Sequence, residues 1–210
     1  MTAPAADGTF DALLCDLDGV LRHWDAGLAP RLEEEYGLAP GAFHGTAFRP
    51  ERLLPAVTGA VTDEAWREAV AEDFAPACGS LARARALVAE WTDTPATVDP
   101  EVRELLTTVG RRVPVVLVTN ATSRLDADLA SLGLTGLAHA VVNSSREGVA
   151  KPDAGIFRVA AGRAGVPAGR CLFVDDTPGH VTAARALGMT AHHHRDNTSL
   201  RRVLAPLLAA

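Results

Sequence analysis

The sequence predicts an α/β fold with a parallel sheet core and an inserted α-helical cap. Five short apolar runs are bounded by polar residues, as buried strands are. Helix-patterned stretches separate these runs, and strands that alternate with helices favour a parallel sheet covered on both faces. Residues 22–98 interrupt this alternation, because they show helical spacing and contain no β-branched run.

The core elements can be assigned in chain order. The first strand is predicted at 12–15, directly before Asp16. Asp99 and Pro100 open the next core helix, because they combine an N-cap residue with proline in the first turn. Gly165 follows the last turn of a later helix. The other strands are predicted at 113–118, 139–142, 171–174 and 189–192, and the core helices at 99–109, 123–132, 153–164 and 180–187.

Residues 22–98 are predicted to form the cap. Asp63 and Glu64 begin one of its helices, where negative charge is favourable. A single crossover between parallel strands needs far fewer residues than this segment contains. We therefore assign 1–21 and 99–210 to a Rossmann-like core, and 22–98 to an α-helical cap over the carboxyl edge of the sheet. Helices in the cap are predicted at 30–36, 62–74 and 80–91.

The composition excludes several classes of protein. The chain has 20 Lys and Arg against 26 Asp and Glu and no dense basic stripe, so we expect no nucleic-acid partner. Residues 1–8 lack the features of a signal peptide, and no apolar run approaches the roughly 20 residues that cross a membrane. Three widely spaced cysteines are typical of buried thiols in a reducing compartment. We expect a cytoplasmic monomer or homodimer with no membrane partner.

Polar residues follow the carboxyl ends of three predicted strands, where ligands bind in open parallel sheets. Lys151, the single lysine beside nineteen arginines, precedes the helix that leads to the 171–174 strand. We expect its ammonium group to meet the polar residues at one edge of the sheet. These residues are Asp16 and Asp18 after the first strand, Thr119 and Asn120 after the 113–118 strand, and Asp175 and Asp176 after the 171–174 strand.

Carboxylates gathered at one point repel one another and need a cation to stay ionised. An all-oxygen set favours a hard ion, most simply Mg²⁺, which leaves coordination positions for water and phosphate. An aspartate can attack phosphorus to give an aspartyl-phosphate, and a metal, a hydroxyl and a lysine can neutralise the transferred group. The pattern therefore predicts phosphoryl-transfer chemistry.

Four segments resemble the motifs of the haloacid dehalogenase superfamily. Asp16-Leu17-Asp18-Gly19-Val20 is similar to the first motif and Val118-Thr119-Asn120 to the second. Lys151-Pro152-Asp153 is similar to the third motif, and Phe173-Val174-Asp175-Asp176-Thr177-Pro178 to the fourth. The resemblance extends from the first strand to the last helix. It places 22–98 where phosphatase-like members of subfamily I have a small helical cap.

The resemblance implies a catalytic set of three residues. Asp16 corresponds to the nucleophile, which is also a Mg²⁺ ligand. Asp18 corresponds to the residue that protonates the leaving group and then activates water. Lys151 corresponds to the cation that neutralises both the phosphate and the nucleophile. The reaction implied is Mg²⁺-dependent removal of phosphate from a small phosphorylated metabolite.

The resemblance also implies the residues that bind phosphate and metal. Thr119 is expected to bind phosphate oxygens together with Lys151, and backbone amides of Leu17, Asp18 and Asn120 are expected to help. Asp175 is expected to join the metal directly or through water. The metal ligands expected are Asp16, Asp18 through its backbone carbonyl, Asp176 and Asp175.

Two features depart from the family pattern. His180 occupies a position where many relatives have an acid or an amide, so it either weakens metal binding or orients a water. The segment Arg22-His23-Trp24 is unusually polar and aromatic for its place after the first motif. It is equally consistent with a specificity role and with a turn in which Trp24 packs under the cap.

Three alternatives to a phosphatase remain open from the sequence. A 2-haloacid dehalogenase is disfavoured by Asp18, because halide leaves without a proton. A binding module with a degenerate site is disfavoured by the intact set of carboxylates and Lys151. A phosphomutase would require the cap to hold a bisphosphate. Cap arginines could do so, namely Arg31, Arg49, Arg52, Arg67, Arg83 and Arg85.

Overall fold

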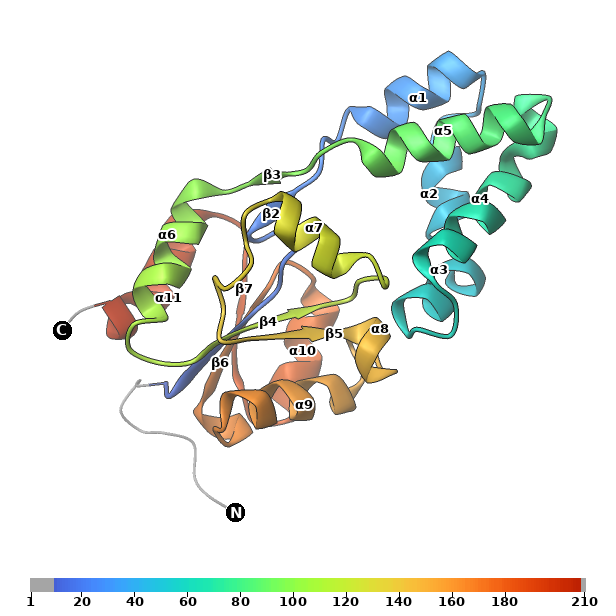
Figure 1. Cartoon of the computed structure of the whole chain (residues 1–210). Coiled ribbons are helices and arrows are strands. Elements are labelled where there is room, and N and C mark those ends of the chain that lie inside the picture. Colours follow the sequence, from blue (N-terminus) through green and yellow to red (C-terminus); the bar gives the residue numbers. More distant parts are fainter. Residues whose placement is uncertain (1–9, 209–210) are drawn as a thin grey trace.

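The computed structural model describes residues 10–208 and contains a five-stranded parallel sheet (Figure 1). The strand order is β5-β4-β1-β6-β7, and every neighbouring pair is parallel. The strands are β1 (Ala12–Cys15), β4 (Val115–Thr119), β5 (Ala140–Asn143), β6 (Cys171–Asp175) and β7 (Thr190–His193). The predicted α/β class is confirmed, and the strand bounds differ from the prediction by at most two residues at an end.

Helices cover both faces of the sheet, because side chains along a strand point alternately to opposite faces. On β1, Leu13 and Cys15 pack into one apolar cluster, whereas Ala12 and Leu14 pack into another. The first cluster lies under α6 (Pro100–Val109), α7 (Leu125–Ser131) and α11 (Asn197–Leu208). The second lies under α9 (Ala154–Ala164) and α10 (Pro178–Ala186).

The chain reverses its direction across the sheet between β1 and β6. From β1 the sequence continues outward to β4 and β5, and then returns to the other side of β1 with β6 and β7. At such a switch point the loops after two adjacent strands diverge and leave a crevice for a ligand. The residues that follow β1 and β6 therefore occupy the most accessible place at the carboxyl edge.

Residues between β1 and α6 form a helical lobe, defined here as α1–α5, which extends beyond the carboxyl edge of the sheet (Figure 1). Its interior is a separate apolar cluster that includes Phe43, Trp66 and Phe74. Two of its helices were not anticipated from the sequence. The lobe consists of α1 (Leu28–Tyr36), α2 (Ala42–Ala47), α3 (Pro50–Val57), α4 (Asp63–Cys78) and α5 (Leu81–Asp93).

The expectation of a purely helical 22–98 segment was wrong at its two ends. Here β2 (Arg22–His23) and β3 (Thr97–Val98) pair as an antiparallel ribbon. The pairing joins segments that are far apart in sequence, so no local pattern could indicate it. The short helices α8 (Ser144–Glu147) and η1 (Ala168–Arg170) and the terminal helix α11 were likewise not predicted.

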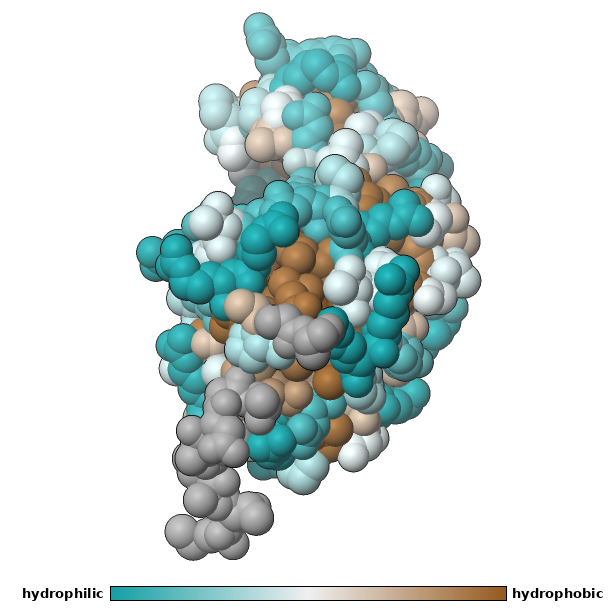
Figure 2. Space-filling model, turned by 90° about the vertical axis from the view of Figure 1, so that its left-hand side faces the viewer, coloured by the Kyte–Doolittle hydropathy of each residue, from teal (hydrophilic) through white to brown (hydrophobic). Residues whose placement is uncertain are grey.

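The surface agrees with the composition. Seen from the side of α6 and α11, the molecule is mostly hydrophilic, with a limited apolar area among charged side chains (Figure 2). All three cysteines are free and buried, as expected. Within residues 10–208, no helix combines the length and the apolar character needed to cross a membrane.

Candidate active site

Lys151 lies at the centre of the site. Its ammonium Nζ is 2.7 Å from Asp16 Oδ1 and 2.7 Å from Asp175 Oδ2. The three side chains are almost completely buried, with exposed fractions of 1% for Lys151, 7% for Asp16 and 0% for Asp175. The fold thus brings together residues from β1, β6 and the turn before α9, and one ammonium group contacts two buried carboxylates.

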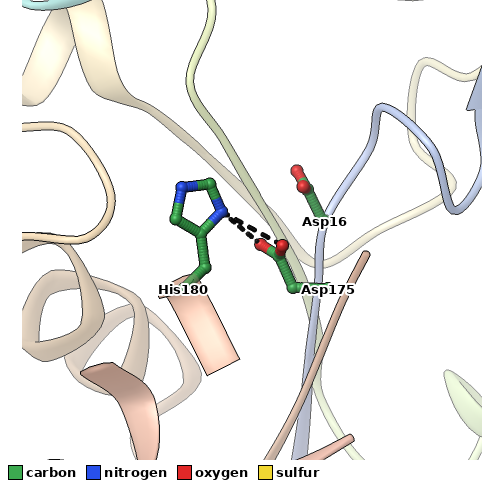
Figure 3. Close-up of side chains that lie close together, drawn as sticks. All are labelled: Asp16, Asp175 and His180. Carbon is green, nitrogen blue, oxygen red and sulfur yellow. Dashed lines mark hydrogen bonds and ion pairs between the residues drawn. The ribbon is translucent and has the colours of Figure 1, made fainter. Parts of the chain in front are cut away.

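Asp175 accepts hydrogen bonds on both oxygens. Besides Lys151, it accepts from the backbone N–H of Thr177 (2.8 Å) and contacts Nδ1 of His180 at 3.0 and 3.1 Å. Because an ionised carboxylate can only accept, Nδ1 of His180 carries the proton in this contact. Figure 3 shows the imidazole directed at Asp175, with Asp16 on the other side. His180, whose role the sequence left open, therefore orients Asp175.

The two carboxylates differ in their electrostatic environment. Burial raises the pKa of Asp16 well above its ordinary range, although the charge of Lys151 opposes this effect. Burial also disfavours the charged form of Asp175, but the hydrogen bond from His180 and the charge of Lys151 lower its pKa to about 2. Burial alone would lower the pKa of Lys151, and the charges of Asp16 and Asp175 raise it. Asp175 therefore holds its negative charge in preference to Asp16.

This difference predicts how acid acts on the metal-free protein. Since the folded-state pKa of Asp175 lies below that of the unfolded chain, its contribution of about 2 kcal/mol is present above about pH 4 and is lost toward pH 2. In the His180→Asn variant the pKa of Asp175 lies nearer its ordinary value, so this contribution is smaller. Urea unfolding between pH 2 and pH 5 measures the difference. Equal losses of stability in the two proteins would contradict the role of His180.

Asn120 fixes the backbone of Lys151. Its side-chain amide donates to the carbonyl oxygen of Lys151 (2.8 Å), and its amide oxygen accepts from the backbone N–H of Lys151 (2.8 Å). The side chain of Asn120 is thus engaged in holding the lysine, whereas the expected phosphate contact of Asn120 is through its backbone amide. Thr119 ends β4 in a buried position, and its hydroxyl makes no hydrogen bond within residues 10–208. Thr119 is accordingly the residue of this pair whose side chain is available to a ligand.

The oxygen atoms around Asp16 suit a hard cation. Asp16 Oδ1 accepts from the backbone N–H of Leu17 (2.7 Å) and faces Lys151, whereas Oδ2 has no hydrogen-bond partner in the described part of the chain. Asp176 is exposed and approaches the backbone of Gly19 so closely that a Cβ there would collide with its carboxylate. Gly19 has a φ of 75°, so this position favours glycine on two grounds.

The donor set therefore fits a divalent ion. Asp16 Oδ2 and the Asp176 carboxylate are the available acidic oxygens, and carboxylate and carbonyl oxygens are the ligands Mg²⁺ prefers. A cation beside Asp16 would also favour its ionised form. Asp175 lies near Asp16 and His180, in a group whose potential ligand atoms are all within 4.8 Å of one another. Its own oxygens, however, are already engaged by Lys151, His180 and Thr177.

Two residues that follow Asp18 hold its carboxylate. Arg22 donates from Nε to Oδ1 (2.7 Å) and from Nη2 to Oδ2 (2.8 Å), and the indole N–H of Trp24 donates to Oδ1 (2.8 Å). Arg22 is buried and also contacts Asp128 at 3.4 Å. Trp24 is 47% exposed and borders the space between the helical lobe and the sheet. Both residues hold the Asp18 carboxylate.

A cavity of about 300 Å³ lies between the helical lobe and the sheet. Asp18 and Asn120 border it on the side of the buried carboxylates. The two parts of the chain are joined beside the cavity through Asp63, a buried residue at the start of α4. Asp63 accepts from the hydroxyl of Thr122 (2.7 Å), and its backbone N–H donates to the hydroxyl of Ser123 (2.9 Å).

The sequence pattern placed Asp63 only at the start of a helix. In the structure Asp63 contacts Thr122 and Ser123, which lie 59 and 60 residues further along the chain. A second connection crosses the same boundary, where Arg124 contacts Asp93 at 2.9 Å. No local signal could reveal either contact, because both depend on how the helical lobe sits against the loop after β4.

A family comparison agrees with this geometry. The model of the haloacid dehalogenase-like hydrolases matches residues 10–188. No curated protein matches the sequence of this chain.

Several solved structures share the fold. The HAD family enzyme bt-2542 of Bacteroides thetaiotaomicron, in complex with magnesium and inorganic phosphate, has a TM-score of 0.71 at 19% identity, over 91% of this chain and 98% of that one. A HAD-like family hydrolase of Porphyromonas gingivalis has a TM-score of 0.72 at 18% identity, over 96% and 99%. The L-2-haloacid dehalogenase of Xanthobacter autotrophicus, with chloropropionic acid covalently bound, has a TM-score of 0.61 at 19% identity, over 96% and 85%.

Proposed function

Because the chain belongs to the haloacid dehalogenase-like hydrolases, we propose that it is a Mg²⁺-dependent phosphatase that acts on a small phosphorylated metabolite. The observation that carries the proposal is the combination of a buried Asp16–Lys151 pair with a second aspartate, Asp18, two residues further on. A nucleophile and a separate proton donor are what hydrolysis of a phosphate ester requires. The helical lobe acts as a cap over this site.

In the proposed reaction, Asp16 attacks phosphorus. One carboxylate oxygen of Asp16 forms the new P–O bond, and the other would face the metal. In the present conformation Leu17 and Lys151 hold Oδ1. The bond from phosphorus to the ester oxygen breaks, and an aspartyl-phosphate results. Lys151 and the hydroxyl of Thr119 offset the charge of the transferred group.

Asp18 moves the protons. In protonated form it gives its proton to the departing alkoxide, and as a carboxylate it then takes a proton from the water that attacks the aspartyl-phosphate. In the present conformation Arg22 and Trp24 engage both of its oxygens, so Asp18 is held as an acceptor. A rotation away from these donors precedes each proton transfer, and Arg22 and Trp24 act as positioning residues.

The metal would be held by Asp16, Asp176 and the backbone carbonyl of Asp18. When bound, Mg²⁺ supplies positive charge that offsets the negative charge of the phosphoryl group. The magnesium and phosphate complex of the Bacteroides enzyme supports this choice of ion. Asp175 is not included among these metal ligands, because its carboxylate contacts and orients Lys151.

The contacts of the cap arginines favour hydrolysis over a phosphomutase reaction, in which the phosphoryl group returns to a sugar phosphate. Of the six arginines considered for a phosphomutase, only Arg67 lines the cavity, and it forms ion pairs with Asp63 (2.6 Å) and Asp93 (3.2 Å). Arg22 and Arg124 also line the cavity and are paired with carboxylates, so residues 10–208 offer no unpaired arginine there for a second phosphate. Halide release is disfavoured because a halide leaves without a proton, so Asp18 would have no proton to transfer in that reaction.

Phosphate release from p-nitrophenyl phosphate and a panel of sugar phosphates tests the proposal. With Mg²⁺ we expect turnover, and with EDTA we expect a loss of at least about 100-fold, because the charge of the phosphoryl group is then poorly offset. Chloride release from 2-chloropropionate, measured without metal, is the matched assay for the alternative chemistry. Metal-independent chloride release with no phosphate release would overturn the assignment.

A further inference from the structure

We propose that the substrate carries an apolar, aryl-sized organic group, and that this group binds in the cavity between the helical lobe and the sheet. The inference rests on the proposed phosphatase function and names the class of ester on which it acts. The cavity has about 300 Å³, near the lower end of the range for small-molecule sites. Asp18 borders it, so a phosphate bound at Asp16 would direct its organic group into this space.

Most of the exposed surface of the wall is apolar. Trp66 and Trp91 lie 5.9 Å apart between ring centroids, and Phe48 meets Trp91 edge to face at 5.6 Å. The indole N–H of Trp66 donates to the carbonyl oxygen of Ala47, so it offers no free polar group to a ligand. Further apolar wall is provided by Leu28, Leu53, Val57, Ala121 and Leu125.

The cationic side chains in the wall are already paired. Arg22 contacts both Asp18 and Asp128, and Arg124 contacts Asp128 and Asp93. Arg67, described above, likewise has two carboxylate partners. A sugar bisphosphate or a dicarboxylate would have to break such pairs, whereas an apolar group would not. The burial of apolar area against these rings is the main binding energy the cavity offers.

A pair of esters tests the inference without changing the chemistry. The leaving alcohols of 3-phenylpropyl phosphate and propyl phosphate have similar acidity, so their P–O bonds are similarly reactive. Burying the phenyl ring should raise kcat/KM roughly 30-fold over the propyl ester, and also above the value for glucose 6-phosphate. Equal kcat/KM values for the phenylpropyl and propyl esters would overturn the inference while leaving the phosphatase function intact.

Two neighbouring leucines provide a matched control. Leu53 lines the cavity, whereas Leu54 is 55% exposed and does not. Leu53→Ser should reduce the ratio of kcat/KM for the phenylpropyl ester to kcat/KM for propyl phosphate about 5-fold. Leu54→Ser should leave both kcat/KM values unchanged. An equal effect of the two substitutions would count against the assigned cavity.

A binding measurement distinguishes failure of this inference from failure of the proposed function, because it does not depend on hydrolysis. The non-hydrolysable 3-phenylpropylphosphonate and propylphosphonate can be titrated in the presence of Mg²⁺ while tryptophan fluorescence is followed, because Trp24, Trp66 and Trp91 all line the cavity. Roughly 30-fold tighter binding of the aryl compound supports the cavity assignment even if neither ester is hydrolysed, a result that would refute the phosphatase function alone. Equal binding refutes the cavity assignment.

Discussion

Replacement of Asp16 by asparagine is expected to lower phosphate release by on the order of 10⁴-fold or more, because an amide cannot form the aspartyl-phosphate. The fold should survive. Burial already disfavours the charged form of Asp16, and Lys151 retains its contact with Asp175 at 2.7 Å. Steady-state phosphate release and urea unfolding of the same preparation test both parts of the prediction.

Asp11, which directly precedes β1, provides the matched control. Its carboxylate contacts the guanidinium of Arg170 at 2.6 Å, far along β1 from the buried cluster. Asp11→Asn should leave turnover unchanged. Substantial turnover by a homogeneous Asp16→Asn preparation would remove Asp16 from its role as nucleophile, whatever the control shows.

Replacement of Lys151 by methionine should have the second large effect, on stability as well as on turnover. Methionine is similar in length but carries no charge, so two buried carboxylates would face each other without a cation. Breaking a buried ion pair in this way costs about 3–5 kcal/mol of unfolding free energy at neutral pH. Urea unfolding of the metal-free protein measures this loss, and phosphate release should fall to the level of the Asp16→Asn variant.

A double variant separates charge from packing. In Lys151→Met combined with Asp175→Asn, one of the two opposed carboxylates is removed, so much of the lost stability should return while turnover remains absent. If the double variant is no more stable than Lys151→Met alone, the destabilisation comes from packing of the new side chain. In that case the electrostatic account of the cluster is incorrect.

The alternation of strands and helices could be predicted from the sequence because it depends on local patterns. Buried strands such as 171–174 are continuous apolar runs, and helix ends such as Asp99-Pro100 carry short-range signals. The convergence of Asp16, Asp175 and Lys151 could also be predicted, because the carboxyl ends of parallel strands meet at one edge. The structure brings these three side chains into contact.

Other features depended on contacts between distant segments. The β2–β3 ribbon pairs Arg22 with Val98, and neither strand has an apolar run to mark it. The resemblance implied that Asp175 joins the metal directly or through water, and the structure adds contacts of its oxygens with Lys151 and His180. The distribution of hydrogen bonds among neighbouring polar groups depends on their distances, which spacing along the chain does not specify.

The sequence by itself thus determined the fold class and the residues at the carboxyl edge, since periodicity and strand ends are encoded locally. Only the tertiary structure decided how those residues are used. It directs the Asn120 side chain to the backbone of Lys151 and the Arg22 guanidinium to Asp18, and it pairs Arg67 with Asp63. The apolar character of the cavity follows from those pairings, because a charge is neutralised only by a partner that the packing of the helical lobe against the sheet brings within reach.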